Sequence, residues 1–171
     1  MIDKKIEGTA NSILLELNIN QPPIDIISIA KSYNISIKPY DLGEGVSGVL
    51  VIDKDKSVIG YNPSEHPHRQ RFTVAHEFGH YVLHRKHSEL FVDKEKVLFR
   101  NQDSATGEFK REREANNFAA AMLMPKYLLE NEAKKRDTDF FDEASISDLA
   151  KLFNVSVQAM TIRLTKLNML W

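Results

Sequence analysis

Residues 71–84 read RFTVAHEFGHYVLH and carry the most informative pattern in the chain, H-E-x-x-H at His76, Glu77 and His80. Residues four apart on a helix are offset by about 40° and about 6 Å, so both imidazoles can point at one ion. Glu77, about 100° round the helix, stands beside that ion, where a carboxylate can take a proton from water. The pattern predicts a helix over residues 69–85 that carries two zinc ligands and a general base.

The setting of the motif favours a metal site over surface histidines. All six histidines fall between His66 and His87 in a chain of 171 residues, whereas chance would scatter them. Apolar residues occupy the opposite side of the helix, and Thr73 is a polar residue on the ligand side. Two neutral imidazoles leave most of the zinc charge uncompensated, which lowers the pKa of a bound water towards about 7. The motif therefore predicts hydrolytic chemistry.

Other side chains near the motif have simpler explanations. His84 continues the stripe one turn after His80, so a fourth ligand, a partner of a ligand and a substrate contact are all open. A straight helix places it too far away for direct ligation, however, and a histidine is favoured electrostatically at a helix C-terminus. Tyr81 could donate to an oxyanion, but packing explains an aromatic residue there better. We expect the remaining histidines, His66, His68 and His87, to be exposed to solvent. Arg69 and Arg71 are expected to form structural ion pairs.

A third protein ligand must come from elsewhere, because a hydrolytic zinc site has three ligands and an open position. The chain has no cysteine, which leaves Asp, Glu or His. The best source is the run EFKREREANNFAAAMLMP, residues 108–125, whose Ala-rich face can pack closely on the motif helix. Glu112 and Glu114 flank its buried stripe on opposite sides, so only one can readily reach the ion. Periodicity alone does not choose between them, and acidic residues, Glu108 included, are also favoured in a first helical turn.

Composition indicates an ordinary folded domain and argues against several classes of protein. The length corresponds to one domain with at most a small appendage. Lys plus Arg (23) against Asp plus Glu (24) give a net charge of −1, so no basic field attracts nucleic acid or an anionic membrane. The longest apolar run, 118–124, is far shorter than the roughly 20 residues of a membrane span. The N-terminal residues lack the apolar stretch of a secretory signal. We therefore expect a cytoplasmic protein without a membrane partner.

The residues before the motif helix predict two helices and a small sheet. Apolar residues at three- and four-residue spacing indicate helices over 1–17 and 22–33. The pattern then changes to short β-branched runs separated by turn residues, which is typical of an antiparallel sheet with a hairpin. Three strands are expected, at 35–37, 47–53 and 57–62.

The residues after the motif helix predict further helices. Residues 87–108 form a long mixed segment that could hold an extra strand, at 90–91 or 97–99, and border a site. The tail reads as helix, short turn, helix. Helices are expected over 109–124, 126–136 and within 144–170. The fold class is therefore α+β, with one domain over 1–140 and a C-terminal helix-turn-helix-like segment over 141–171.

Four runs of sequence closely resemble the ImmA/IrrE family of metallopeptidases: RFTVAHEFGHYVLH, EREANNFAAAMLMP, IDIISIAKSYNISI and GVSGVLVIDKDKSVIGYNPS. The resemblance spans roughly residues 20–130, and the tail resembles the helical segment that follows in that family. It implies a zincin-like core of helices against a three-stranded, mainly antiparallel sheet. It also implies His76 and His80 as zinc ligands, Glu77 as the catalytic glutamate and, in the E-A-N-x-F-A run, Glu114 as the third ligand. The expected cofactor is Zn²⁺, with Mn²⁺ as the alternative.

Two functional hypotheses follow from these observations. The first is a zinc endopeptidase that cuts one cognate protein, for which the resemblance implies a helix-turn-helix repressor or antitoxin-like regulator. The second is a DNA-binding or protein-binding regulator in which the metal site is structural. A structural zinc site would have four ligands and no need of Glu77. The sequence therefore favours the enzyme.

The charge of the terminal helix pair supports the same choice. A recognition helix needs Lys or Arg at the phosphates, yet residues 156–170 offer only Arg163 and Lys166. The preceding helix supplies Lys151 against Asp148. We expect this segment to serve packing or substrate docking and not to bind DNA specifically.

Overall fold

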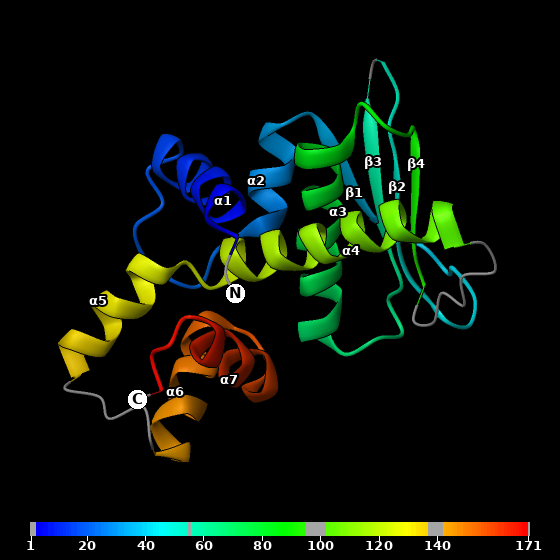
Figure 1. Cartoon of the computed structure of the whole chain (residues 1–171). Coiled ribbons are helices and arrows are strands. Elements are labelled where there is room, and N and C mark those ends of the chain that lie inside the picture. The colour runs from blue at the N-terminus through cyan, green and yellow to red at the C-terminus, as the bar shows by residue number, and fades with distance from the viewer. Residues whose placement is uncertain (1–2, 55, 95–101, 137–141, 171) are drawn as a thin grey trace. The chain divides into compact units, whose positions relative to one another are not determined.

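The computed structural model describes residues 3–54, 56–94, 102–136 and 142–170 (Figure 1). The chain divides into two compact units, Asp25–Ala119 and a second unit made of Met1–Ile24 with Ala120–Trp171. The first unit contains the sheet and the motif helix, and the second consists of helices. The domain boundary expected after residue 140 falls outside the described residues, so it stays a prediction.

The sheet of the first unit has four strands in the order β1-β3-β2-β4. Strand β2 pairs antiparallel with both β3 and β4, but β1 pairs with β3 in parallel. The three-stranded, mainly antiparallel sheet expected from the sequence is therefore replaced by a four-stranded mixed sheet. Side chains alternate with the same period in parallel and antiparallel pairs, so the sequence pattern could not reveal the direction of β1. The strands are β1 (Ile35–Pro39), β2 (Val46–Val51), β3 (Ser57–Tyr61) and β4 (Leu90–Lys94).

Strand β4 is the additional strand and forms one edge of the sheet. It lies in the mixed segment 87–108, where the sequence left a strand open at 90–91; the alternative at 97–99 falls outside the described residues. Leu90 and Val92 are 56% and 39% exposed, so the alternate residues of β4, Phe91 and Asp93, belong to the opposite face. This face carries two side chains to the motif helix.

The motif helix is α3 (Pro67–His84), and it contacts β2, β3, β4 and the short helix α2 (Ile26–Ser32). Its start is specified locally, because Pro67 occupies the first turn and the His66 side chain accepts a hydrogen bond from the backbone of His68. Every residue from Thr73 to His80 is buried. The central turns of α3 are therefore covered on all sides, including the side that carries the polar motif residues.

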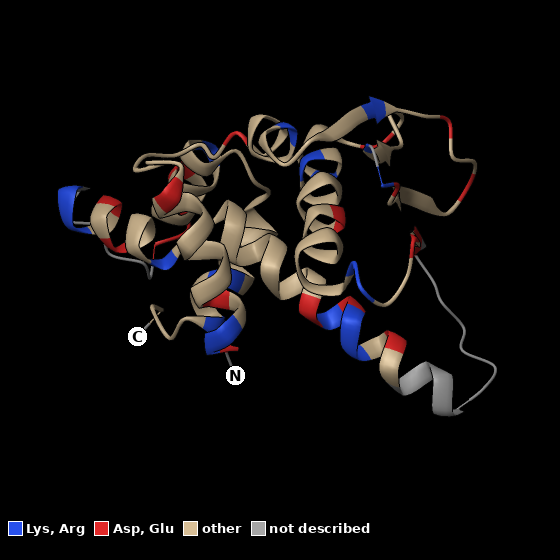
Figure 2. Cartoon of the chain, turned by 90° about the horizontal axis from the view of Figure 1, so that it is seen from above, with Lys and Arg blue, Asp and Glu red and all other residues tan. Residues whose placement is uncertain are grey.

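Helix α4 (Gln102–Leu123) packs against the motif helix. It begins at residue 102, earlier than the expected residue 109. Figure 1 shows α4 crossing α3. A Cβ atom on Gly79 would lie 3.3 Å from the Cα atom of Ala115 and 3.1 Å from the ring of Phe118, so the two helices touch at these small residues. The charged residues of α4 all precede Ala115 in the sequence, and Figure 2 shows red and blue gathered towards one end of this helix.

The second unit contains α1 (Lys4–Glu16), α5 (Lys126–Arg136), α6 (Glu143–Phe153) and α7 (Val157–Lys166). Asn154 ends α6 in the left-handed conformation (φ 54°), and the Ser156 side chain caps α7, which gives the helix, turn, helix expected for the tail. Arg163 of α7 is 3% exposed and forms a bidentate ion pair with Glu7 of α1. No helix of the described residues is long and apolar enough to cross a membrane.

Candidate metal centre

Three donor groups meet where α3 and α4 cross. The Nε2 atoms of His76 and His80 are 3.1 Å apart, and the two carboxylate oxygens of Glu112 lie 3.2 Å and 3.1 Å from them. Zn²⁺ binds nitrogen and oxygen at about 2.0–2.1 Å, so tetrahedral ligands stand about 3.3 Å from one another. Lone pairs of two imidazoles and a carboxylate facing one point also repel unless a cation lies between them. The donor set therefore fits a divalent metal ion, whose identity the donors alone do not fix.

The two histidines are oriented by different neighbours. The Nδ1 atom of His76 donates a hydrogen bond to Oδ1 of Asn116 at 3.0 Å, which leaves Nε2 as the metal-facing nitrogen. The ring of His80 stacks on Phe91 of β4, with centroids 4.6 Å apart and planes inclined by 21°. Its Nδ1 atom has no hydrogen-bond partner among the described residues. A polar contact thus fixes His76, and packing fixes His80.

Glu77 lies beside these donors and is completely buried. Neither of its carboxylate oxygens has a hydrogen-bond partner among the described residues. Gly48 of β2 makes the room, because a Cβ atom there would collide with Cγ2 of Thr73 and lie 3.0 Å from Oε1 of Glu77. Strand β2 therefore leaves space for the unpaired carboxylate of Glu77 next to the three donor groups, and a general base needs this position.

The charges of the centre are strongly coupled. Burial, with the negative charges of Asp93 and Glu112, raises the pKa of Glu77 well above its usual value. Burial lowers the pKa of His80, which keeps its imidazole in the neutral form that binds metals. Although burial by itself acts in the opposite direction, the close contacts with the His76 and His80 rings lower the pKa of Glu112 to about 2. At neutral pH these lowered pKa values leave His80 neutral and Glu112 negatively charged, which are the forms that bind a cation.

The structure brings Glu112, and not Glu114, to the histidine pair. Relative to Ala115, which faces α3, Glu112 and Asn116 lie about 60° and about 100° round α4 in one direction, and Glu114 lies about 100° in the other. Glu114 is instead 3.5 Å from Nε2 of His84 and 3.8 Å from Lys110. The assignment of Glu114 as third ligand is thus corrected in favour of the other flank. The spacing E-x-x-x-N was the available signal, because it puts a ligand and a histidine partner on one side of α4.

The other residues considered from the sequence lie outside the donor set. His84 is buried against Glu114, and burial, followed by the charge of His80, lowers its pKa to about 4. The ring of Tyr81 stacks against Phe78, and its hydroxyl accepts a hydrogen bond from Arg85 at 3.4 Å. Packing therefore explains Tyr81, as expected.

An acidic residue of β4 was missed by sequence reasoning. Asp93 offers an oxygen within 4.8 Å of ligand atoms of both His76 and Glu77. Arg69 of α3 donates to Oδ2 of Asp93 at 3.4 Å and to Ser47 at 2.9 Å, and it pairs with Glu65 at 3.8 Å. The expected structural role of Arg69 is confirmed by these contacts. No local motif marks Asp93, because strand pairing alone brings it to the site.

The site combines two imidazoles from α3 with a carboxylate from α4. Beside them lies the buried, unpaired carboxylate of Glu77. This combination is typical of a metal-dependent hydrolase. The family model of the IrrE N-terminal-like domain, Peptidase_M78, matches residues 30–165. The chain therefore belongs to this family of metallopeptidases, and the family resemblance found in the sequence is confirmed.

Comparison of the fold adds a more distant similarity. A Mycobacterium tuberculosis transcriptional regulator has a similar structure, with a TM-score of 0.68 at 18% sequence identity. The match covers 96% of this chain and 47% of the regulator, so the chain spans about half the length of that protein. No curated protein is similar enough in sequence to give a significant match. At this identity the similarity concerns the fold alone.

Proposed function

We propose that the chain is a zinc-dependent endopeptidase that hydrolyses one peptide bond in a specific protein, a helix-turn-helix repressor or antitoxin-like regulator. The observation that carries the proposal is the state of Glu77, which is buried beside the three donors with both oxygens unpaired. Such a carboxylate costs stability and has no use in a purely structural metal site. A hydrolase needs it as the group that moves the proton of the attacking water.

Each residue of the site has a separate role in the proposed hydrolysis. His76, His80 and Glu112 would hold the ion, which supplies Lewis acidity towards water and a peptide carbonyl when bound. Glu77 takes a proton from the water and transfers it to the nitrogen of the leaving amine. Asn116 keeps the His76 ring in one orientation and one tautomer throughout. Gly48 leaves Glu77 the space to reach the reacting atoms.

The edge of the sheet suits a polypeptide substrate. Strand β4 has a partner only on its β2 side within the described sheet, and it carries Phe91 and Asp93 at the metal centre. An extended peptide can add to a free strand edge through main-chain hydrogen bonds. A flexible linker of a repressor meets this requirement better than a folded domain, because its backbone groups are not already paired.

The alternative, a DNA-binding regulator with a structural metal, is weakened by the contacts of Arg163. Its Nε atom donates to the carbonyl of Met124 at 2.9 Å, and its remaining donors bind Glu7. Lys151 pairs with Asp148 at 3.1 Å. The buried guanidinium of α7 is thus committed inside its own unit and does not reach a phosphate. We therefore assign the terminal helices to packing or substrate docking.

The test compares two zinc-loaded proteins, the parent chain and Glu77→Gln. Each is incubated with the repressors encoded next to its gene, and the products are identified by mass spectrometry. We expect the parent to cut one repressor at a single bond and Glu77→Gln to leave it intact while it retains zinc. Equal cleavage by both proteins, or by neither, contradicts the proposal. A gel shift of promoter DNA at low salt tests the DNA-binding alternative.

A further inference from the structure

Asp93 forms a second cluster of ligand atoms with Glu77 on the sheet side of the centre. Its carboxylate stands within 4.8 Å of the Glu77 carboxylate, and Gly48 is the residue opposite Asp93 across the β2–β4 pair. The same glycine makes room for Glu77. The edge strand and the motif helix thus direct two acidic side chains into one space beside the three donors.

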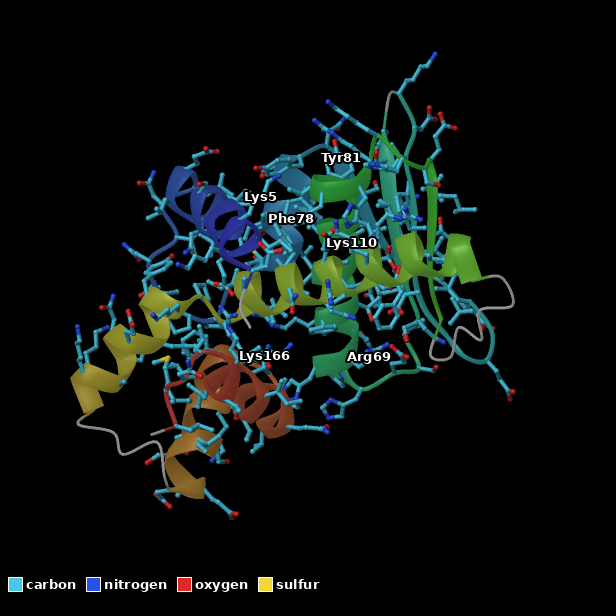
Figure 3. All side chains as sticks on the ribbon, viewed as in Figure 1. Lys5, Arg69, Phe78, Tyr81, Lys110 and Lys166 are labelled. Carbon is cyan, nitrogen blue, oxygen red and sulfur yellow. The ribbon has the colours of Figure 1, made fainter. Side chains whose placement is uncertain are left out.

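Little positive charge from neighbouring side chains compensates the two carboxylates of this cluster. Glu77 is completely buried, and both of its oxygens lack a hydrogen-bond partner among the described residues. Among the described residues, Asp93 is held by Arg69, which is labelled in Figure 3, through Oδ2 at 3.4 Å. The Arg69 side chain is 40% exposed and also donates a hydrogen bond to Ser47 at 2.9 Å. One oxygen of Asp93 and both oxygens of Glu77 therefore remain available to a cation.

We propose that Asp93 and Glu77 form a second, weaker binding site for a divalent cation, whose occupation prevents Glu77 from acting as the base. Two oxygens bound to one ion can be separated by up to about twice the metal–oxygen distance, about 4–5 Å, which is compatible with the observed spacing. His76 would hold the first ion and donates to Asn116, so the protein ligands left to the second site are carboxylate oxygens. The binding claim stands by itself, and only its inhibitory consequence rests on the proposed function.

Oxygen donors set the class of ion and make Mn²⁺ a suitable probe. Carboxylate and water ligands suit Mg²⁺, Ca²⁺ and Mn²⁺, whereas a site of two imidazoles and a carboxylate suits Zn²⁺. Zn²⁺ also binds more tightly than Mn²⁺ to a given site, so added Mn²⁺ does not displace it from the first site. Mn²⁺ bound to the zinc-loaded chain therefore reports the second site.

The experiment titrates the chain loaded with one Zn²⁺ with Mn²⁺ and measures free Mn²⁺ by electron paramagnetic resonance. We expect one additional Mn²⁺ per chain, with a dissociation constant of about 10⁻⁴–10⁻³ M, as in weak oxygen-ligand sites. Asp93→Asn keeps the shape and should weaken this binding by about 10–100-fold, with zinc content unchanged. Asp148→Asn removes an exposed carboxylate of α6 and serves as the matched control with parental binding.

A second variant changes the affinity in the opposite direction. Arg69→Gln removes the cation that competes for Asp93, so Mn²⁺ should bind at least about fivefold more tightly. Absence of a second Mn²⁺ in the parent, or parental binding in Asp93→Asn, overturns the proposal. Cleavage is measured separately: Mn²⁺ should slow the parent and not Asp93→Asn. A chain that cuts no repressor but binds the second ion refutes the proposed function alone.

Discussion

Gly79 of α3 and Ala115 of α4 are in direct contact, because a Cβ atom on Gly79 would lie 3.3 Å from both the Cα atom and the carbonyl oxygen of Ala115. This contact sets how α4 is rotated against α3. It turns Glu112 and Asn116 towards the histidine pair and leaves Glu114 on the side of His84. The packing of two small residues therefore selects which glutamate joins the histidine pair in the candidate metal site.

Zinc affinity should distinguish the two glutamates of α4. Glu112→Gln removes the negatively charged carboxylate that faces His76 and His80, so we expect the affinity for zinc to fall by at least about 10–100-fold. Glu114→Gln lies outside the donor set and should retain parental affinity. Competition with a chromogenic chelator measures both. Loss of zinc in Glu114→Gln with retention in Glu112→Gln would restore the assignment made from the sequence.

Asn116 should behave as a positioning residue. Asn116→Ala leaves Nδ1 of His76 without its acceptor and should lower zinc affinity by about 10–100-fold. Asn116→Asp keeps an acceptor at the same place and should restore most of the affinity. A purely structural role would give the two variants equal thermal stability losses and no difference in zinc binding, so both quantities are measured.

Gly48→Ala should separate metal binding from catalysis. The added methyl group collides with Thr73 and presses on Glu77, whereas the three donors lie on α3 and α4. We expect zinc to remain bound and the cleavage rate to fall by about 10²-fold or more, as for displacement of a general base. Gly8→Ala in α1 is the control, because nothing lies within 4 Å of its added Cβ atom. A Gly48→Ala protein with parental turnover would show that Glu77 tolerates displacement.

His84 should contribute a loss of stability to the metal-free protein as the pH falls from 7 to 4. Burial lowers the pKa of His84 to about 4 in the folded chain, from 6.5 in the unfolded chain. The unfolded state therefore binds more protons in this range, so stability is present above pH 6.5 and is lost as the pH falls to 4. The difference corresponds to about 3 kcal/mol. Urea unfolding in chelator is measured across this pH range for the parent and His84→Gln, and the difference between the two stability profiles should change by that amount; identical pH profiles would exclude a contribution from His84.

The ion pair between Glu7 and Arg163 should contribute strongly to the stability of the helical unit. Glu7→Gln leaves a guanidinium that is 3% exposed without its counter-charge, and breaking a buried pair in this way costs about 3–5 kcal/mol. Glu16→Gln, an exposed change in the same helix, should be within about 0.5 kcal/mol of the parent. Chemical denaturation compares them. Equal midpoints would mean that the pair contributes little.

Local sequence patterns were sufficient to identify the element that carries the two histidines of the candidate metal site, and several of its neighbours. Helical periodicity and the spacing of His76 and His80 identified α3, because a helix fixes the angle between residues four apart whatever surrounds it. The β-branched runs located β1 to β3 for a similar reason, since alternation follows from the strand itself. Turn residues also placed the two terminal helices, whose junction is fixed by Asn154 and Ser156.

Tertiary packing supplied the rest of the centre. The choice of Glu112 over Glu114 depends on the rotation of α4 about its own axis, which follows from the contact between Gly79 and Ala115. Asp93 reaches Glu77 only because β4 pairs with β2 at the edge of the sheet. Periodicity fixes angles within one helix or strand, but the rotation and pairing between elements depend on how their side chains fill the space between them.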